Sequence, residues 1–233
     1  MKTIVEVIRA GDVQSLARML EVQPDLASTR IVDRGGVGRT PLHIATDWPG
    51  HFPNGVPVVR ALIAAGAQVN APVTGCSAHS EAPLHWAASS DDLEVAAALI
   101  AAGANVEAGG GSIGGGTPLD NAVGYGCWQV ARLLVERGAR VEKLWHASAL
   151  GLMSEVERLI VSCTPEQIND AFWQACHGAQ PRAAAYLLAH GADMTWVPNY
   201  ARQSPLEIAS SLDTRRETLV TWLRKQSPAS ATS

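Results

Sequence analysis

The chain lacks any long apolar run, and none of its 233 residues lies in a stretch of about 18 consecutive apolar residues that could span a membrane. Its first residues, Met1 to Glu6, also lack the long apolar segment of a signal peptide. Positive charge is scarce too, since 18 Lys and Arg against 22 Asp and Glu give a net charge of −4. We therefore expect a cytoplasmic protein that binds neither nucleic acid nor a membrane.

Several signatures of cofactor chemistry are missing as well. The four cysteines form no CxxC pair, which predicts reduced thiols, and no His, Cys, Asp or Glu residues show a recognised metal-ligand spacing. The glycine run 109–116 lacks the Lys-Ser/Thr that follows in a phosphate-binding loop, so it is interpreted as a flexible finger. We expect no cofactor and no metal.

A repeated motif dominates what is present. Its clearest copy, Thr40-Pro41-Leu42-His43-Ile44-Ala45, is followed about twenty residues later by an apolar run ending at Gly66, and the pattern returns at 82–87 and at 117–122. Thr and Pro favour the start of a helix, and Gly favours its end. Paired apolar residues, such as Leu133-Leu134, mark the buried stripe of a second helix. Each helix pair is too small to bury its own apolar face, so the copies must stack.

On these residues the chain resembles the ankyrin-repeat family over nearly its whole length. The resemblance implies an all-α solenoid of about seven stacked helix pairs joined by short hairpin fingers, in a single domain over residues 1–226. Within it we expect a capping helix pair at 1–28, three well-formed repeats at 36–142, two degenerate repeats at 143–193 and a last repeat at 203–225. Residues 227–233 are expected to fray.

The spacing between copies is uneven. Insertions occur at 49–55, between the helices of one repeat, and at 73–80, in the next finger, whereas residues 141–144 leave no room for a fourth finger. Long fingers on one half of a concave groove predict a walled pocket there.

The resemblance also places the first helix of each pair on the concave side, and implies that His43 and His85 join finger to helix by hydrogen bonds. Aromatic residues are only 5% of the chain, yet five lie on predicted first helices. For Trp145 and Trp173, filling of the core remains an equal alternative. The candidate acid and base groups are Asp47, Glu81, His79 and Tyr125. The candidate ligand contacts are Arg39, Trp48, His51, Trp86, Asp120, Asn121, Trp145, His146 and Trp173.

Two functions follow from this arrangement. The walled pocket and its aromatic side chains favour an enzyme that needs no cofactor, a lyase or cyclase acting by proton transfer on a large, apolar, conjugated metabolite. The alternative is a scaffold without chemistry that binds a protein partner in its concave groove. Whether the last repeats mediate formation of a homodimer is left open by the sequence.

Overall fold

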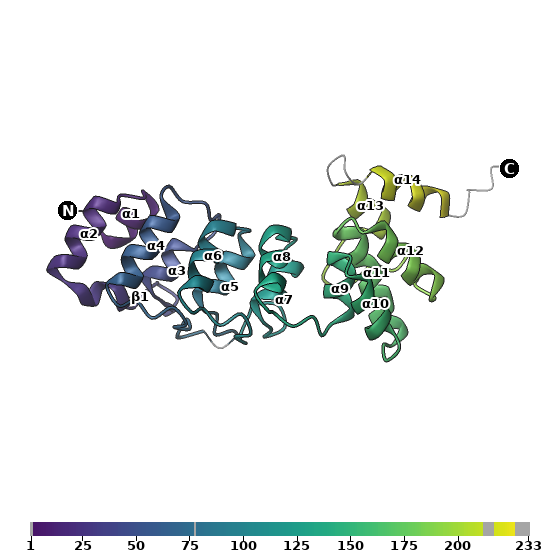
Figure 1. Ribbon diagram of the computed structural model, residues 1–233, viewed down its shortest axis with the longest axis horizontal. Coiled ribbons are helices and arrows are strands. Elements are labelled where there is room, and N and C mark those ends of the chain that lie inside the picture. Colours follow the sequence, from purple (N-terminus) through teal and green to yellow (C-terminus); the bar gives the residue numbers. More distant parts are fainter. Residues whose placement is uncertain (1, 77, 212–216, 227–233) are drawn as a thin grey trace. The chain divides into compact units, whose positions relative to one another are not determined.

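The computed structural model describes residues 2–76, 78–211 and 217–226 (Figure 1). Helices dominate it, and the predicted tail 227–233 lies outside the described residues. The helices of the first part are α1 (Ile4–Arg9), α2 (Val13–Val22), the short 3-10 helix η1 (Pro24–Ser28), α3 (Pro41–Ala45), α4 (Gly55–Ala64), α5 (Pro83–Ser89), α6 (Leu93–Ala101), α7 (Pro118–Gly124) and α8 (Trp128–Glu136). Those of the second part are α9 (Leu144–Leu150), α10 (Met153–Ile160), α11 (Pro165–His177), α12 (Pro181–Ala189), α13 (Pro205–Ser210) and α14 (Glu217–Gln226).

Consecutive α-helices pair as the sequence predicts, giving seven pairs among the described residues. Proline opens α3, α5 and α7, where its missing N–H is not needed. Gly66 and Gly103 follow α4 and α6 with φ of 95° and 90°, the left-handed conformation that ends a helix. A Cβ at either position would meet nothing within 4 Å, so it is the backbone conformation that favours glycine there.

The helices divide into two compact units, Met1–Arg140 and Val141–Ser233. In the first unit, α1, α3, α5 and α7 contact one another in succession, and α2, α4, α6 and α8 form a second layer in the same order. The core lies between these layers. Leu42, Leu84 and Leu119, which occupy the same motif position, are each at most 1% exposed.

The loops of the first unit lie beside the first helices. Strands β1 (Ile31–Val32) and β2 (Gly38–Arg39) form an antiparallel hairpin, and Gly38 bridges to Thr74 in the next finger. The insertion between α3 and α4 is fixed at both ends, since the Asn54 amide donates to Gly11 O and the His51 N–H donates to Asp92. The insertion 49–55 is therefore anchored to the turns that precede α2 and α6.

The second unit repeats this scheme with a larger first helix. The long α11 packs against α9, α12 and α13, and the C-terminal α14 packs against α12 and α13. Phe172 and Cys176 of α11 are fully buried in the core, and burial raises the pKa of the Cys176 thiol. As predicted, residues 141–143 lead directly into α9 without a finger.

In the part of the chain that the structure describes, no helix is both long enough and apolar enough to cross a membrane.

Candidate functional site

The histidines of the repeat motif connect neighbouring repeats. The Thr40 N–H donates to His43 Nδ1 at 3.1 Å, so the ring proton lies on Nε2, which donates to the carbonyl of Glu81 at 3.0 Å. His43 is fully buried, and this burial lowers its pKa from 6.5 to about 4. A neutral imidazole therefore joins the start of α3 to the finger before α5, as the resemblance implies.

His85 makes the same connection one repeat later. The Ala82 N–H donates to its Nδ1 at 3.1 Å, and its Nε2 donates to the carbonyl of Gly116 at 3.3 Å. In the third repeat Asp120 stands at this position and accepts from the Thr117 N–H at 2.7 Å. A carboxylate can reproduce the cap but has no N–H to donate to a following finger.

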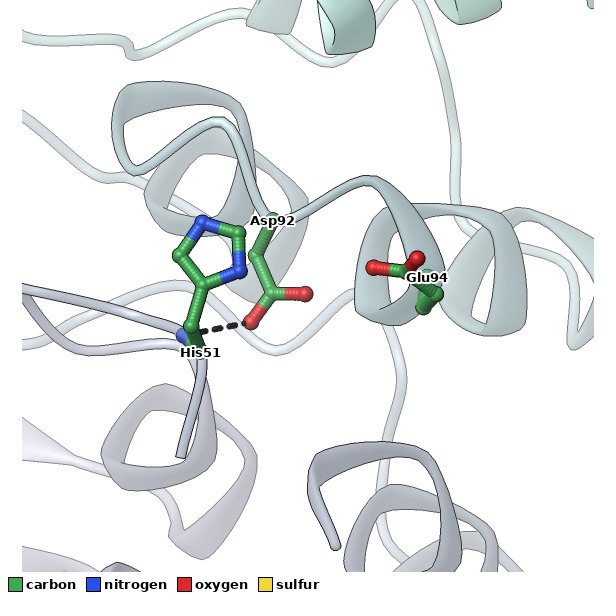
Figure 2. A group of neighbouring side chains, drawn as sticks. All are labelled: His51, Asp92 and Glu94. Atoms are coloured by element: carbon green, nitrogen blue, oxygen red, sulfur yellow. Dashed lines mark hydrogen bonds between the residues drawn. The ribbon is translucent and has the colours of Figure 1, made fainter. Parts of the chain in front are cut away.

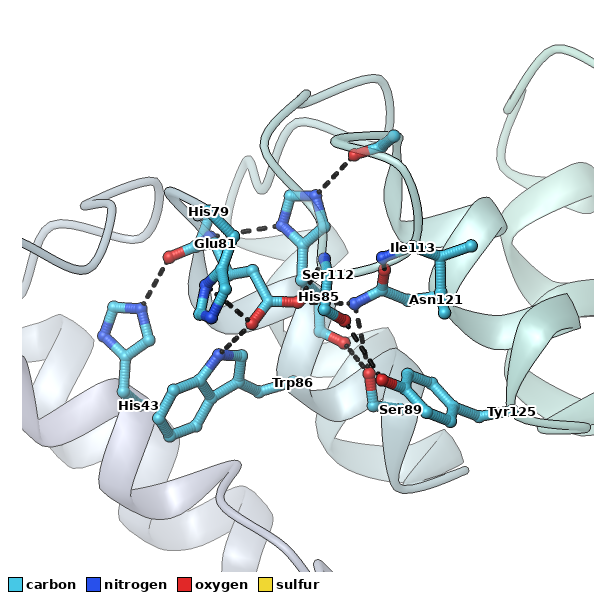
Figure 3. A network of polar contacts seen from close by, with 12 residues as sticks. His43, His79, Glu81, His85, Trp86, Ser89, Ser112, Ile113, Asn121 and Tyr125 are labelled. Carbon is cyan, nitrogen blue, oxygen red and sulfur yellow. Dashed lines mark hydrogen bonds and ion pairs between the residues drawn. The ribbon is translucent and has the colours of Figure 1, made fainter. Parts of the chain in front are cut away.

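Glu81 is the centre of the polar network beside these histidines (Figure 3). Its Oε1 accepts from the Asn121 amide at 2.6 Å and from the Ser112 N–H at 3.0 Å, and its Oε2 accepts from the Trp86 indole at 3.0 Å. His79 Nδ1 lies 3.4 Å from the same Oε2. Glu81 is 6% exposed. Burial alone would raise its pKa, but the bonds from Asn121 and Ser112 outweigh it and hold the pKa below 4.5.

Trp86 is half-buried rather than freely exposed in a groove. Besides its bond to Glu81, the indole lies edge-to-face against His43, with ring centroids 5.1 Å apart. The Arg39 guanidinium lies 6.0 Å from its ring centroid. Trp86 therefore contributes to the wall of the site and to the packing between two repeats.

The glycine-rich finger, which its composition predicts to be flexible, is a hydrogen-bonded part of the site. Gly110 and Gly111 donate to Gly115 O and Gly116 O, and the finger holds Ser112 against Glu81. A Cβ at Gly111 would lie 2.6 Å from Asn121 Oδ1. Glycine is needed at this position because the finger packs closely on the network.

These side chains border a hollow of about 530 Å³, which we call the groove pocket. Two aromatic side chains at its border are strongly exposed, Trp48 at 79% and Tyr125 at 53%. The Tyr125 hydroxyl lies 3.3 Å from Ser112 Oγ, and Ser89 Oγ accepts from the Asn121 amide at 3.2 Å. The lining consists of Asp47, Trp48, Glu81, Trp86, Ser89, Ser90, Ser112 and Tyr125.

Asp47, the second predicted base, is already ion-paired. Its Oδ2 lies 2.8 Å from Arg9 Nη2 and 4.0 Å from Arg39 Nη1. Arg39 is in turn paired with Asp33 at 3.0 Å. The two carboxylates of the groove pocket thus have protein partners, and neither is an isolated general base.

His51 lies apart from the groove pocket lining, near Asp92 and Glu94 (Figure 2). One ligand atom from each of these three residues falls within 4.8 Å of the others, a grouping that their sequence spacing does not indicate. Asp92, however, already accepts the N–H groups of His51 at 2.8 Å and Val95 at 3.2 Å. Asp92 and Glu94 also occupy the start of α6, where the helix dipole stabilises carboxylates. This geometry is explained by helix capping.

The remaining predicted contacts belong to other surroundings. Trp173 and His146 are buried in the second unit at 5% and 2% exposure, so neither presents surface to a ligand. The Trp173 indole donates to Gln203 O, and its ring belongs to the hydrophobic core of this unit. Trp145 lines a separate pocket in the second unit.

Sequence reasoning overlooked two contributors to the groove pocket. Ser112 supplies both an N–H to Glu81 and a hydroxyl to Tyr125, and its only signal is that it interrupts a glycine run. Arg9, which pairs with Asp47, lies 38 residues before its partner in the capping helix pair. No local pattern predicts that contact.

Comparison with known proteins supports the prediction of stacked repeats. Residues 54–143 match the family model described as ankyrin repeats (3 copies). Among curated protein sequences, none matches the chain significantly. The crystal structure of the human ASB11 ankyrin repeat domain is similar to 98% of this chain and to 100% of its own, with a TM-score of 0.54 and 18% identity. At that identity the similarity concerns the fold alone, and the predicted all-α fold of stacked helix pairs is confirmed.

Proposed function

Because this chain is an ankyrin-repeat protein, we propose that it binds a protein partner through the groove pocket, with Trp48 and Tyr125 as anchors. The exposure of these two side chains, 79% and 53%, is the observation that carries the proposal. Large aromatic side chains are enriched among the residues that dominate binding energy at protein interfaces. They also flank a hollow that a partner side chain can enter.

The charges of the pocket favour a neutral occupant. Glu81 already accepts three hydrogen bonds, and Asp47 is paired with Arg9. A partner cation would have to compete with these bonds, and a partner carboxylate would be repelled. What remains exposed is indole, phenol and serine hydroxyl, so we expect an apolar or aromatic side chain of the partner between Trp48 and Tyr125.

The test uses the wild-type chain and its variants as baits in quantitative pull-down experiments. The affinity of each captured protein for each bait is then measured. The double variant Trp48→Ala/Tyr125→Ala should weaken binding about 30-fold or more, as loss of a hot spot does. Its stability should stay within about 1 kcal/mol of the wild type, because both side chains are exposed. Val22→Ala removes an apolar residue that is 87% exposed on α2 and is the matched control. Unchanged affinity in the double variant refutes the proposal.

A small molecule is the second candidate for the same pocket. A volume of about 530 Å³ falls within the range of ligand sites, and aromatic walls suit an apolar ligand. The lyase or cyclase chemistry expected from the sequence finds no support in the electrostatics. A base needs a pKa near the working pH, whereas the pKa of Glu81 is held low and its oxygens accept hydrogen bonds from Asn121, Ser112 and Trp86.

Turnover assays on purified protein separate binding from catalysis. Loss of a positioned base or acid lowers the rate about 10²–10⁴-fold. If a metabolite is converted, and both Glu81→Gln and Tyr125→Phe reduce the rate to that extent while substrate still binds, the enzyme candidate replaces the scaffold. Equal rates in the variants would assign the conversion to another site.

A further inference from the structure

The second unit contains a pocket of its own, which we call the Tyr200 pocket. It has a volume of about 720 Å³ and lies between the start of α9, the start of α11 and the loop that follows α12. Its aromatic lining is Trp145, Trp196 and Tyr200, and its acidic lining is Glu142, Glu166 and Asp170. Aromatic faces and carboxylates thus border one hollow.

The aromatic side of this pocket is held in place by specific contacts. Tyr200 is 62% exposed, yet its ring lies edge-to-face against the buried Trp173 with centroids 5.8 Å apart. Its hydroxyl donates to Asp170 Oδ1 at 2.5 Å and accepts from the Gln174 amide at 3.1 Å. An exposed aromatic ring fixed at both ends loses little conformational entropy when a ligand covers it.

The charge of the lining is negative. Three carboxylates face a single basic residue, Lys143. Among the described residues, the Asp170 carboxylate accepts one hydrogen bond, from the Tyr200 hydroxyl to Oδ1. Burial, and to a lesser degree the charge of Glu166, raise the pKa of Asp170 despite its bond from Tyr200. A cation placed beside this carboxylate would stabilise its charged form.

Lys143 shows how a cation fits this lining. Its ammonium lies 5.7 Å from the centroid of the Trp145 ring, which is cation–π distance. The pocket therefore already holds one alkylammonium group against an aromatic face. Two further aromatic residues of the lining, Trp196 and Tyr200, lie on the loop that follows α12.

We propose that the Tyr200 pocket binds an organic cation, an alkylammonium or guanidinium group, with its charge beside Asp170 and its apolar stem against Trp196 and Tyr200. An anion is disfavoured by the three carboxylates. A bare metal ion would leave the aromatic faces unused, whereas a side-chain-sized organic cation uses both features. The cation comes either from a basic side chain of a polypeptide or from a free amine.

The experiment titrates the full-length protein with N-acetyl-lysine methylamide, N-acetyl-arginine methylamide, tetramethylammonium and agmatine, followed by calorimetry and by tryptophan fluorescence. Two uncharged compounds of similar shape serve as ligand controls. N-acetyl-norleucine methylamide matches the lysine amide, and neopentyl alcohol matches tetramethylammonium. We expect at least one cation to bind about 10-fold or more tightly than its isostere. Binding of the amino-acid amides assigns the site to a polypeptide side chain, and binding of tetramethylammonium or agmatine alone assigns it to a free amine.

Three variants locate the binding. Asp170→Asn keeps an oxygen for the Tyr200 hydroxyl and removes the charge, so cation binding should fall about 10-fold with little change in melting temperature. Lys143→Met removes the competing cation and should tighten binding. Glu157→Gln, on the exposed side of α10, is the matched control and should change nothing.

The proposal is overturned if the isosteres bind as well as the cations, if no probe binds at millimolar concentration, or if Asp170→Asn binds like the wild type. If Asp170→Asn also lowers the melting temperature, its loss of binding does not count as support. The outcome then depends on Lys143→Met, which must still tighten cation binding. The groove pocket proposal stands or falls separately, since Trp48 and Tyr125 are not part of this lining.

Discussion

Replacing Glu81 by Gln should destabilise the protein by about 1–3 kcal/mol, the cost of one hydrogen bond to a charged group. The carboxylate uses Oε1 for Asn121 and Ser112 and Oε2 for the Trp86 indole. An amide has one acceptor oxygen, which can keep the first two bonds. Its NH₂ group then faces the Trp86 N–H, donor against donor. Because the indole is only half-buried, water can partly replace the lost partner, and this favours the lower part of the range.

The pH dependence gives the prediction its sign. The pKa of folded Glu81 lies below the ordinary 4.5, so its ionised form contributes stability above pH 4.5, and this contribution is lost as the pH falls through the folded pKa. Gln cannot titrate. The difference in unfolding free energy between wild type and Glu81→Gln should therefore be largest near pH 7 and shrink in acid.

Urea unfolding at pH 7 and at pH 4, followed by circular dichroism and tryptophan fluorescence, measures this difference. Glu21→Gln, which removes an exposed carboxylate from α2, is the matched control and should stay within about 0.5 kcal/mol of the wild type. Equal stability of Glu81→Gln and wild type at pH 7, or a difference that is the same at both pH values, would refute the view that an ionised Glu81 holds the network together.

Three further changes test the framework around the site. Gly111→Ala should lower the melting temperature, because its Cβ would lie 2.6 Å from Asn121 Oδ1, whereas Gly109→Ala, whose nearest neighbour is 3.7 Å away, should not. Leu84→Ala should cost about 2–5 kcal/mol in denaturant titration, because it leaves a cavity between repeats, and a near-neutral result would contradict the repeat alignment. Stability should also fall between pH 6.5 and about 4, because the unfolded chain binds a proton that buried His43 resists. A His43→Gln variant should show a flatter pH profile over this interval.

The repeat architecture was predictable because its determinants are local. Proline at the start of α3 and glycine after α4 act on the backbone within one turn, so the helix pairs follow from the sequence. The insertion 49–55 and the missing fourth finger were equally visible, since both change the spacing between copies.

The chemistry of the site was harder to predict because it depends on contacts between distant residues. Glu81 was expected to be a base, but its amide partner lies 40 residues away, and that bond helps to hold the carboxylate in its charged form. Ser112 and Arg9 reach their carboxylate partners across 31 and 38 residues.

The Tyr200 pocket lies in repeats that have lost the motif. Its loop carries Trp196 and Tyr200, two aromatic residues in a chain with few of them. The scarcity of aromatic residues elsewhere makes these two noticeable in the sequence. Without the repeat motif, however, the sequence offers no alignment that would place the loop beside α11.

The single charge of Glu81 connects segments from several repeats. This affects how the first unit unfolds locally. The carboxylate accepts hydrogen bonds from α5, from the glycine finger and from α7, while the Glu81 carbonyl accepts one from His43 of α3. Local opening of the finger removes a donor from a buried ion, so fluctuations that expose only one repeat carry an added free-energy cost. The segments that form the groove pocket should accordingly open together. The amide N–H groups of Ser112 and Thr40 should therefore exchange their hydrogens with the same opening free energy.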